Sequence, residues 1–268
     1  MTPTPEQQDL AAAIGRVLQA DAEIEAAWLG GSLGRGAGDA FSDVDVIALV
    51  ADGAAAAVGR RYAADVSAIA EAVLVMPLYR ARIVSVVTSD WRRFDLSFIE
   101  AADLARYAAG SVSVLFNKGV RSPPTQPRTT YQATPATVLP LVKEFLRVAG
   151  LASVAFGRQE WILALSGLQI LRGLTLDLML EENGVGPAER GGALRRNPFL
   201  SEEQRRALEQ LAPVAANRES LLAANLEIAA VFLPRARRLA ARIGAEWPTA
   251  FEDATRRHLQ ARLGLLLP

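Results

Sequence analysis

A proline-rich segment at residues 121–135 divides the chain into two stretches with different hydrophobic patterns. Prolines among polar residues are typical of a linker. Four of the chain's 14 prolines lie in this segment: Pro123, Pro124, Pro127 and Pro135. The stretch before it mixes apolar runs of strand length with helical patterns, whereas the stretch after it is helical throughout. We therefore expect a domain at 1–120, a linker at 121–135 and a second domain at 136–268.

The first stretch has the pattern of an α+β domain. Apolar residues at helical spacing predict helices at 5–20, 54–73 and 101–109. Short runs rich in β-branched residues, bounded by turn residues, predict strands. These strands are expected at 24–29, 44–50, 83–88, 94–99 and 112–116. We expect a small mixed sheet with flanking helices.

The second stretch has the pattern of an all-α helical bundle. Its expected helices are 138–156, 160–182, 201–211, 217–243 and 249–263. Ser201 is followed three residues later by Gln204, which is the spacing of a capping box at a helix start. The fold class is therefore an α+β domain followed by a helical bundle.

The composition excludes several kinds of chemistry. The chain has no cysteine and one histidine, His258, so disulfides, thiolate sites and multi-histidine zinc sites are ruled out. A Ser-His-Asp triad would have to use His258, which lies in a helical pattern near the C-terminus. Lys+Arg and Asp+Glu both total 29, so there is no general attraction to nucleic acid or to an anionic membrane. Chemistry in this chain is expected to rely on carboxylates.

The apolar stretches do not predict a membrane protein. The first residues lack a basic region followed by an apolar run, so no signal peptide is expected. The longest apolar stretches are interrupted by Arg, Asp or Gly before the ~20 residues that a membrane span requires. We expect a cytoplasmic protein without a membrane partner.

Two acids, Asp43 and Asp45, stand two residues apart at the start of the apolar run 44–50. The period of two in a strand places both side chains on one face. Neighbouring carboxylates repel unless a cation lies between them, and carboxylate oxygens suit Mg²⁺ together with substrate phosphates. Such a pair also occurs as a solvated strand end.

A glycine-rich turn, Gly30 to Gly36, lies between the strand 24–29 and this acid pair. Gly30 and Gly31 allow the backbone to approach a phosphate closely, and the start of a following short helix favours an anion. The hydroxyl of Ser32 can donate to a phosphate oxygen, and Arg35 can add a positive charge or lie on the surface. A glycine-rich turn is also often only a tight turn.

The order of these features resembles the DNA polymerase β-like nucleotidyltransferase superfamily. Its signature is Gly-Ser, a short helix and an Asp-X-Asp pair that opens a strand, and Gly31-Ser32 and Asp43-Val44-Asp45 match it in type, order and spacing. Ser42 before the pair is similar to the small-molecule branch, the aminoglycoside and lincosamide adenylyltransferases. These join a catalytic domain to a helical bundle. The motif resemblance covers roughly residues 26–99.

The resemblance implies a third carboxylate on a neighbouring strand. Asp95 is our choice because it is a lone acid in an alternating apolar strand, where a buried charge is costly without a partner. Glu100 and Asp90 are weaker rivals, and a structural role for Asp95 stays open. The implied cofactor is Mg²⁺ in a two-metal site held by Asp43, Asp45 and Asp95. The implied co-substrate is ATP, whose nucleoside monophosphate passes to a hydroxyl with release of pyrophosphate.

The helical half is expected to help bind a small hydroxylated acceptor between the domains, with an aminoglycoside-like antibiotic as the first candidate. Glu160 is a candidate general base or partner for ammonium groups, and otherwise an acid at a helix start. Arg158 is a candidate contact for the triphosphate. Two other readings remain open, namely a transferase that acts on a protein or RNA, and an inactive scaffold that binds a ligand or partner. The sequence leaves the oligomeric state and the nucleotide base undecided.

Overall fold

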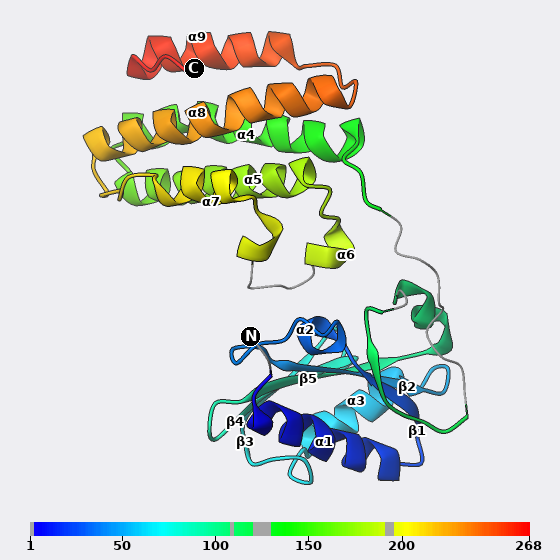
Figure 1. Ribbon diagram of the computed structural model, residues 1–268. Coiled ribbons are helices and arrows are strands. Elements are labelled where there is room, and N and C mark those ends of the chain that lie inside the picture. The colour runs from blue at the N-terminus through cyan, green and yellow to red at the C-terminus, as the bar shows by residue number, and fades with distance from the viewer. Residues whose placement is uncertain (1–2, 108–109, 120–129, 191–195) are drawn as a thin grey trace. The chain divides into compact units, whose positions relative to one another are not determined.

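The computed structural model describes residues 3–107, 110–119, 130–190 and 196–268 (Figure 1). The chain divides into two compact units, Met1–Thr129 and Thr130–Pro268. This boundary falls inside the segment expected to be a linker, whose residues 121–129 lie outside the described part of the chain. Each unit is described by itself.

The first unit is built on a six-stranded mixed sheet with the order β3-β4-β5-β2-β1-β6. Its strands are β1 Ile24–Leu29, β2 Val44–Val50, β3 Ala72–Leu78, β4 Ile83–Thr88, β5 Arg93–Ile99 and β6 Ser113–Asn117. The central pair β2 and β5 is parallel, and the other neighbouring strands are antiparallel. The expected small mixed sheet is therefore confirmed.

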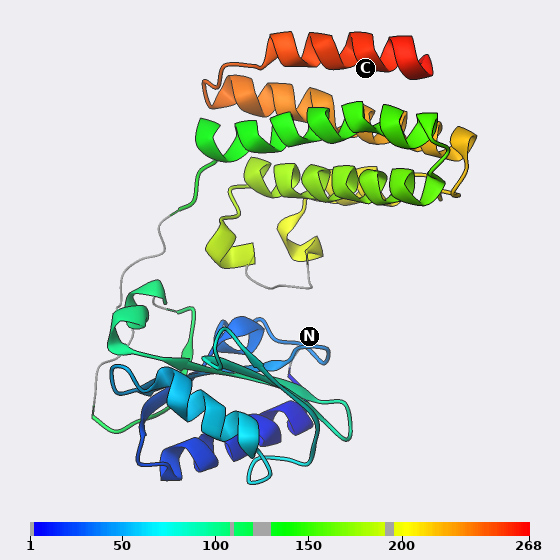
Figure 2. The same cartoon turned by 180° about the vertical axis from the view of Figure 1, so that it is seen from behind.

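Helices α1 (Pro5–Ala20) and α3 (Ala55–Ala64) cover one face of this sheet, as both ribbon views show (Figures 1 and 2). The start of α1 is fixed by a capping box between Thr4 and Gln7, with proline at the first helical position. Apolar residues of both helices pack on alternate residues of the strands and form the larger core of the unit.

The opposite face of the sheet carries a smaller apolar core. It consists of Ala26, Trp28, Ile47, Leu49, Ile99 and Leu104. Leu104 belongs to the 3₁₀ helix η1 (Ala101–Arg106), which therefore packs on this second face. Because side chains alternate along a strand, the odd-numbered residues of β2 and β5 share this face. The strand positions 45 and 95 are among them.

Two of the expected helices are wrong in part. The helix expected at 54–73 ends at Ala64, because Asp65 is extended and its carboxylate accepts a hydrogen bond from the Ser67 amide at 2.8 Å. Val66 and Ile69 are buried, but in a non-helical segment, and the chain then enters strand β3. The helix expected at 101–109 is the 3₁₀ helix η1, and residues 108–109 lie outside the described part of the chain.

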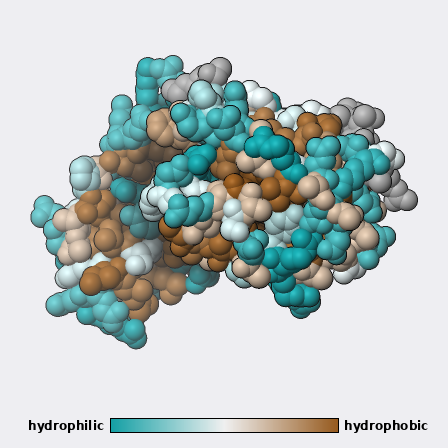
Figure 3. Space-filling model, turned by 90° about the horizontal axis from the view of Figure 1, so that it is seen from below, coloured by the Kyte–Doolittle hydropathy of each residue, from teal (hydrophilic) through white to brown (hydrophobic). Residues whose placement is uncertain are grey.

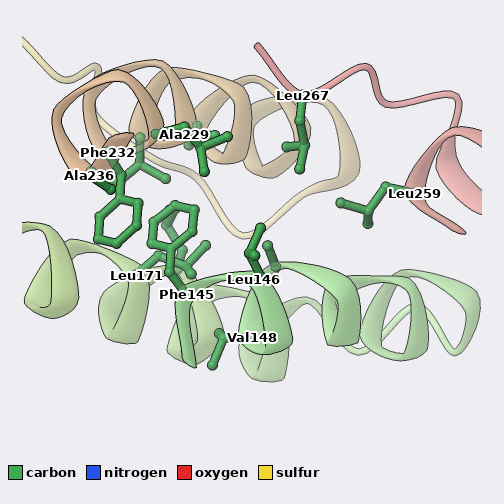
Figure 4. Packing of buried hydrophobic residues seen from close by; sticks show 14 of the residues in the cluster. Phe145, Leu146, Val148, Leu171, Ala229, Phe232, Ala236, Leu259 and Leu267 are labelled. Carbon is green, nitrogen blue, oxygen red and sulfur yellow. The ribbon is translucent and has the colours of Figure 1, made fainter. Parts of the chain in front are cut away.

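The second unit is a helical bundle. Its elements are α4 Pro135–Gly157, α5 Trp161–Glu182, α6 Pro187–Arg190, η2 Asn197–Phe199, α7 Glu202–Glu209, α8 Arg218–Arg242 and α9 Thr249–Leu263. The expected capping box of Ser201 and Gln204 is present at the start of α7. In the core, Phe145 of α4 and Phe232 of α8 stack with ring centroids 3.8 Å apart (Figure 4).

One helix differs from the expectation that every apolar stretch is interrupted too soon to span a membrane. Among the described residues, α5 is long and apolar enough to cross a membrane by length and composition. It packs on α4 and α8 in the bundle, and 33% of its most apolar window is buried there. Over the face of the molecule seen in Figure 3, hydrophobic residues are interspersed with hydrophilic ones.

Candidate active site

The site is centred on two carboxylates from neighbouring parallel strands. Asp45 of β2 and Asp95 of β5 stand directly opposite each other in the register of the sheet. Both are half-buried on the face that carries the smaller core. Asp43 precedes β2 and is half-buried as well. The sheet register thus places Asp45 and Asp95 side by side, and Asp43 lies just before β2, within electrostatic reach of both.

The glycine-rich turn lies directly against Asp45. It forms the short helix α2 (Gly31–Gly34), and the Gly30 amide donates to the backbone carbonyl of Asp45 at 2.8 Å. Gly31 has a φ of 55°, and a Cβ atom at this position would stand 1.7 Å from Asp45 Oδ2. Only glycine fits here, both for its backbone conformation and for the space that the carboxylate occupies. Ser32 follows within α2 and is half-buried.

Burial and the repulsion of neighbouring acids disfavour the charged forms of Asp45 and Asp95. The pKa of Asp45 is raised to about 6, mainly by burial and then by the negative charges of Asp43 and Asp95, against the opposing effect of Arg35 and Arg93. Burial also raises the pKa of Asp95, while a hydrogen bond with Ser85 opposes this rise. The acids therefore lie within electrostatic reach of one another, in surroundings that disfavour unneutralised charge.

The donor set suits a hard divalent cation. Within the described residues, no three Asp, Glu, Cys or His side chains converge closely enough to form a ready-made metal-binding group. The three acids nevertheless offer the oxygen ligands that Mg²⁺ takes, and their repulsion is relieved by a positive charge between them. The residues fit the metal by chemistry, and their assignment as ligands stays a prediction.

The loop before Asp43 is held by side chains that the sequence reasoning missed. Gln7 Nε2 donates to the backbone carbonyls of Asp39 at 2.9 Å and Ser42 at 2.6 Å. Asp39 Oδ1 accepts from the Phe41 amide at 3.0 Å and from Ser42 Oγ at 3.1 Å. The only sequence signal for Gln7 is its place in the capping box of α1. Its contact with the loop is a tertiary feature without a motif.

Arg93 is a second residue that the sequence reasoning missed. It is the first residue of β5, it is half-buried, and its position has the same parity as Asp95. Its guanidinium donates to the Phe41 carbonyl at 3.2 Å. The sequence did offer a signal for Arg93, because it stands two residues before Asp95 and the period of two in a strand places both side chains on one face.

The remaining predicted residues have different surroundings. Arg35 is the C-cap residue of α2 and is exposed, yet its charge lowers the pKa of Asp45, so it lies near the acids. Arg158 and Glu160 are exposed residues of the second unit at the turn between α4 and α5. Glu160 is the N-cap residue of α5 but makes no capping hydrogen bond through its side chain. The cluster described above therefore consists of residues of the first unit.

The rival acids are engaged elsewhere. Asp90 bonds with the Thr88 hydroxyl at 2.5 Å and with Arg92 at 2.7 Å in the turn before β5. Glu100 is the N-cap residue of η1, and its oxygen lies 3.6 Å from Arg82. Of the acids near β5, Asp95 is the one in register with Asp45.

Comparisons with known proteins find a likeness to solved structures. No protein-family model matches the chain, and no curated protein matches it. Solved structures are similar to the chain, among them the crystal structure of an aminoglycoside 6-adenyltransferase from Bacillus subtilis. This likeness has a TM-score of 0.44 and 15% sequence identity, and it covers 95% of this chain and 97% of that chain. A likeness at this level assigns no activity, which must come from the chemistry of the site.

Proposed function

We propose that this protein is a metal-dependent nucleotidyltransferase that transfers AMP from ATP to a hydroxyl group of a small molecule. The observation that carries the proposal is the packing of Gly31 against Asp45, beside Asp95 on the next parallel strand. This arrangement joins a backbone turn suited to phosphate with a set of acids suited to Mg²⁺. The resemblance of Gly31-Ser32 and Asp43-X-Asp45 to the polymerase β-like signature supports the same reading.

The proposed reaction is an in-line displacement. The acceptor oxygen forms a bond to the α-phosphorus, the bond to the β-phosphate oxygen breaks, pyrophosphate leaves, and the hydroxyl proton passes to a base. Divalent metal, when bound, supplies charge stabilisation for the attacking and leaving oxygens. Asp43 and Asp45 would hold the metals, and Asp95 would complete the ligand set on the side of the acceptor hydroxyl. The Ser32 hydroxyl and the backbone amides of α2 would donate to phosphate oxygens.

We propose an aminoglycoside-like acceptor, with the helical unit contributing to its recognition. Glu160 is the proposed base or partner for ammonium groups, and Arg158 is the proposed contact for the triphosphate. Both side chains are exposed, so a ligand can reach them. The absence of cysteine and the single histidine leave this carboxylate chemistry as the one that the composition supports. The cytoplasm, which supplies ATP and Mg²⁺, is the proposed compartment.

Pyrophosphate release across a panel of aminoglycosides and lincosamides tests the proposal. ATP, Mg²⁺ and the wild-type chain should release pyrophosphate with at least one acceptor, and Asp45→Asn should not. If no compound in the panel causes pyrophosphate release while the nucleotide still binds, the proposed antibiotic acceptor is rejected. A transferase that acts on a protein or RNA target would then remain. A thermal-shift measurement tests the activity itself. If a non-hydrolysable ATP analogue with Mg²⁺ does not raise the unfolding temperature, the chain is a scaffold and not a transferase.

A further inference from the structure

Arg93 lies on the same face of the sheet as the proposed metal ligands. It precedes Asp95 by two residues in β5, so both side chains leave the strand on one side. Its positive charge lies within electrostatic reach of the carboxylates of Asp45 and Asp95. Arg93 is therefore a half-buried cation beside the acid cluster.

The guanidinium of Arg93 also holds the loop that leads to Asp43. It donates to the carbonyl of Phe41, two residues before Asp43, at 3.2 Å. The side chain of Phe41 is 80% exposed and does not anchor this loop by burial. The bond thus ties the start of β5, which carries Asp95, to the segment that carries Asp43.

The neighbouring Arg92 provides a natural comparison. Its position has the opposite parity, and its guanidinium pairs with Asp90 at 2.7 Å in the turn before β5. It also donates to the Glu6 carbonyl at 3.5 Å, at the start of α1. Among the described residues, the guanidinium of Arg92 makes its hydrogen bonds and ion pair with Asp90 and Glu6 and not with the loop before Asp43. Arg92 and Arg93 carry the same charged group, but only Arg93 has the strand parity of Asp95.

We propose that Arg93 is a positioning residue of this site, which holds the Asp43 loop against β5 and so keeps Asp43 at a working distance from Asp95. The inference rests on the proposed nucleotidyltransferase function. Residues that orient metal ligands through their own hydrogen bonds typically change metal affinity or activity by about 10- to 100-fold when they are removed. The positive charge adds to this role, because it offsets part of the repulsion among the three acids.

Three variants of the full chain separate a positioning role from a structural one. Arg93→Met removes the charge and the donors while keeping a long side chain, Arg93→Lys keeps the charge and one donor group, and Arg92→Met is the matched control. Free Mn²⁺ is measured by electron paramagnetic resonance during titration in the presence of α,β-methylene-ATP. Turnover is measured as pyrophosphate release, and thermal unfolding reports the fold.

We expect Arg93→Met to weaken Mn²⁺ binding and to lower kcat, each by about 10- to 100-fold, with a smaller change in the KM for nucleotide. Arg93→Lys should recover part of both losses, and Arg92→Met should match the wild type. Wild-type Mn²⁺ affinity in Arg93→Met, or equal losses in Arg93→Met and Arg92→Met, would overturn the inference. If Arg93→Met does not fold, Arg93→Lys provides the test instead. The inference then requires that Arg93→Lys binds Mn²⁺ more weakly than Arg92→Met does.

These results distinguish the inference from the function on which it rests. If the wild-type chain binds neither Mn²⁺ nor the nucleotide analogue, the proposed function itself fails. If the wild type binds both and the Arg93 variants bind them equally well, only the positioning role of Arg93 fails.

Discussion

The carboxylate of Asp45 occupies the space that a side chain at Gly31 would need. A Cβ atom there would stand 1.7 Å from Oδ2 and 2.8 Å from Cγ of Asp45. Gly31 also has a φ of 55°, a conformation that residues with a side chain rarely adopt. The first residue of α2 and the acid at the start of β2 are therefore fitted to each other, and neither can change without moving the other.

We expect Gly31→Ala to abolish turnover, because the added methyl group displaces the Asp45 carboxylate. The left-handed conformation alone costs about 1–2 kcal/mol for a residue other than glycine. Pyrophosphate release measures the activity, and chemical denaturation measures the free energy of unfolding. Gly36→Ala is the control, because Gly36 has a φ of 69° but no atom within 4 Å of a Cβ. Equal activity losses in the two variants would show that the contact with Asp45 has no special role.

The sequence was sufficient to predict the helices and strands whose residues are buried in a regular pattern. The predicted helix at 5–20 matches α1, and the apolar run at 44–50 matches β2. Strand β3 was missed because its sequence is apolar at consecutive positions and contains Pro77, so it lacks the alternation of a half-buried strand. In the structure its residues Val73, Leu74 and Met76 are exposed.

The same limit applies to the site. The neighbourhood of Asp45 and Asp95 could be anticipated because the family resemblance implies a third carboxylate on a neighbouring strand, and Asp95 is a lone acid in an apolar strand. The contacts of Gln7 and Arg93 could not, because both donate to backbone carbonyls of the loop 39–42. Every residue has such a carbonyl, so the acceptor leaves no trace in the sequence. The shape of the loop decides which backbone carbonyls accept hydrogen bonds from these two side chains.

Asp45→Asn should abolish turnover while the chain stays folded. Loss of a metal ligand removes several kcal/mol of transition-state stabilisation, which corresponds to about a thousandfold or more in rate. Without divalent cations, the unfolding temperature should equal or exceed that of the wild type, because one of three repelling charges is removed. Mg²⁺ with a nucleotide analogue should then no longer raise it. Asp65→Asn, an exposed acid that bonds locally to Ser67, is the control, and near-normal turnover in Asp45→Asn would refute the metal assignment.

Acid should weaken the helical unit through Glu252, which is 5% exposed and bonds with Trp247, Arg237 and Arg256. Burial alone would raise its pKa, but the hydrogen bonds from Trp247 and Arg256 and the charges of the two arginines outweigh burial and lower it below 4.5. A carboxylate whose pKa is lowered by folding stabilises the folded state at pH values above its pKa in the unfolded chain. This stabilisation is lost as the pH falls through its pKa in the folded chain.

Thermal unfolding of the wild type between pH 7 and pH 3 checks this expectation. Glu252→Gln should unfold at a lower temperature at pH 7 and should lose less stability than the wild type below pH 4.5, the ordinary value for this group. Asp253→Asn, its exposed neighbour in α9, should follow the wild-type curve. Parallel curves for Glu252→Gln and the wild type would show that the Glu252 cluster does not contribute to acid sensitivity.

Gln7→Leu should impair both the stability of the first unit and its turnover. The amide of Gln7 is 7% exposed and serves three partners, the Asp39 and Ser42 carbonyls and the Thr4 amide. Each buried group left without its partner costs about 1–3 kcal/mol, and the loop before Asp43 would lose its attachment to α1. Gln8→Leu is the control, because Gln8 is the exposed neighbour in the same helix. Turnover is compared under conditions in which both variants are folded, so that a lower rate in Gln7→Leu reports the displacement of Asp43. Equal rates would mean that the loop keeps Asp43 in place without α1.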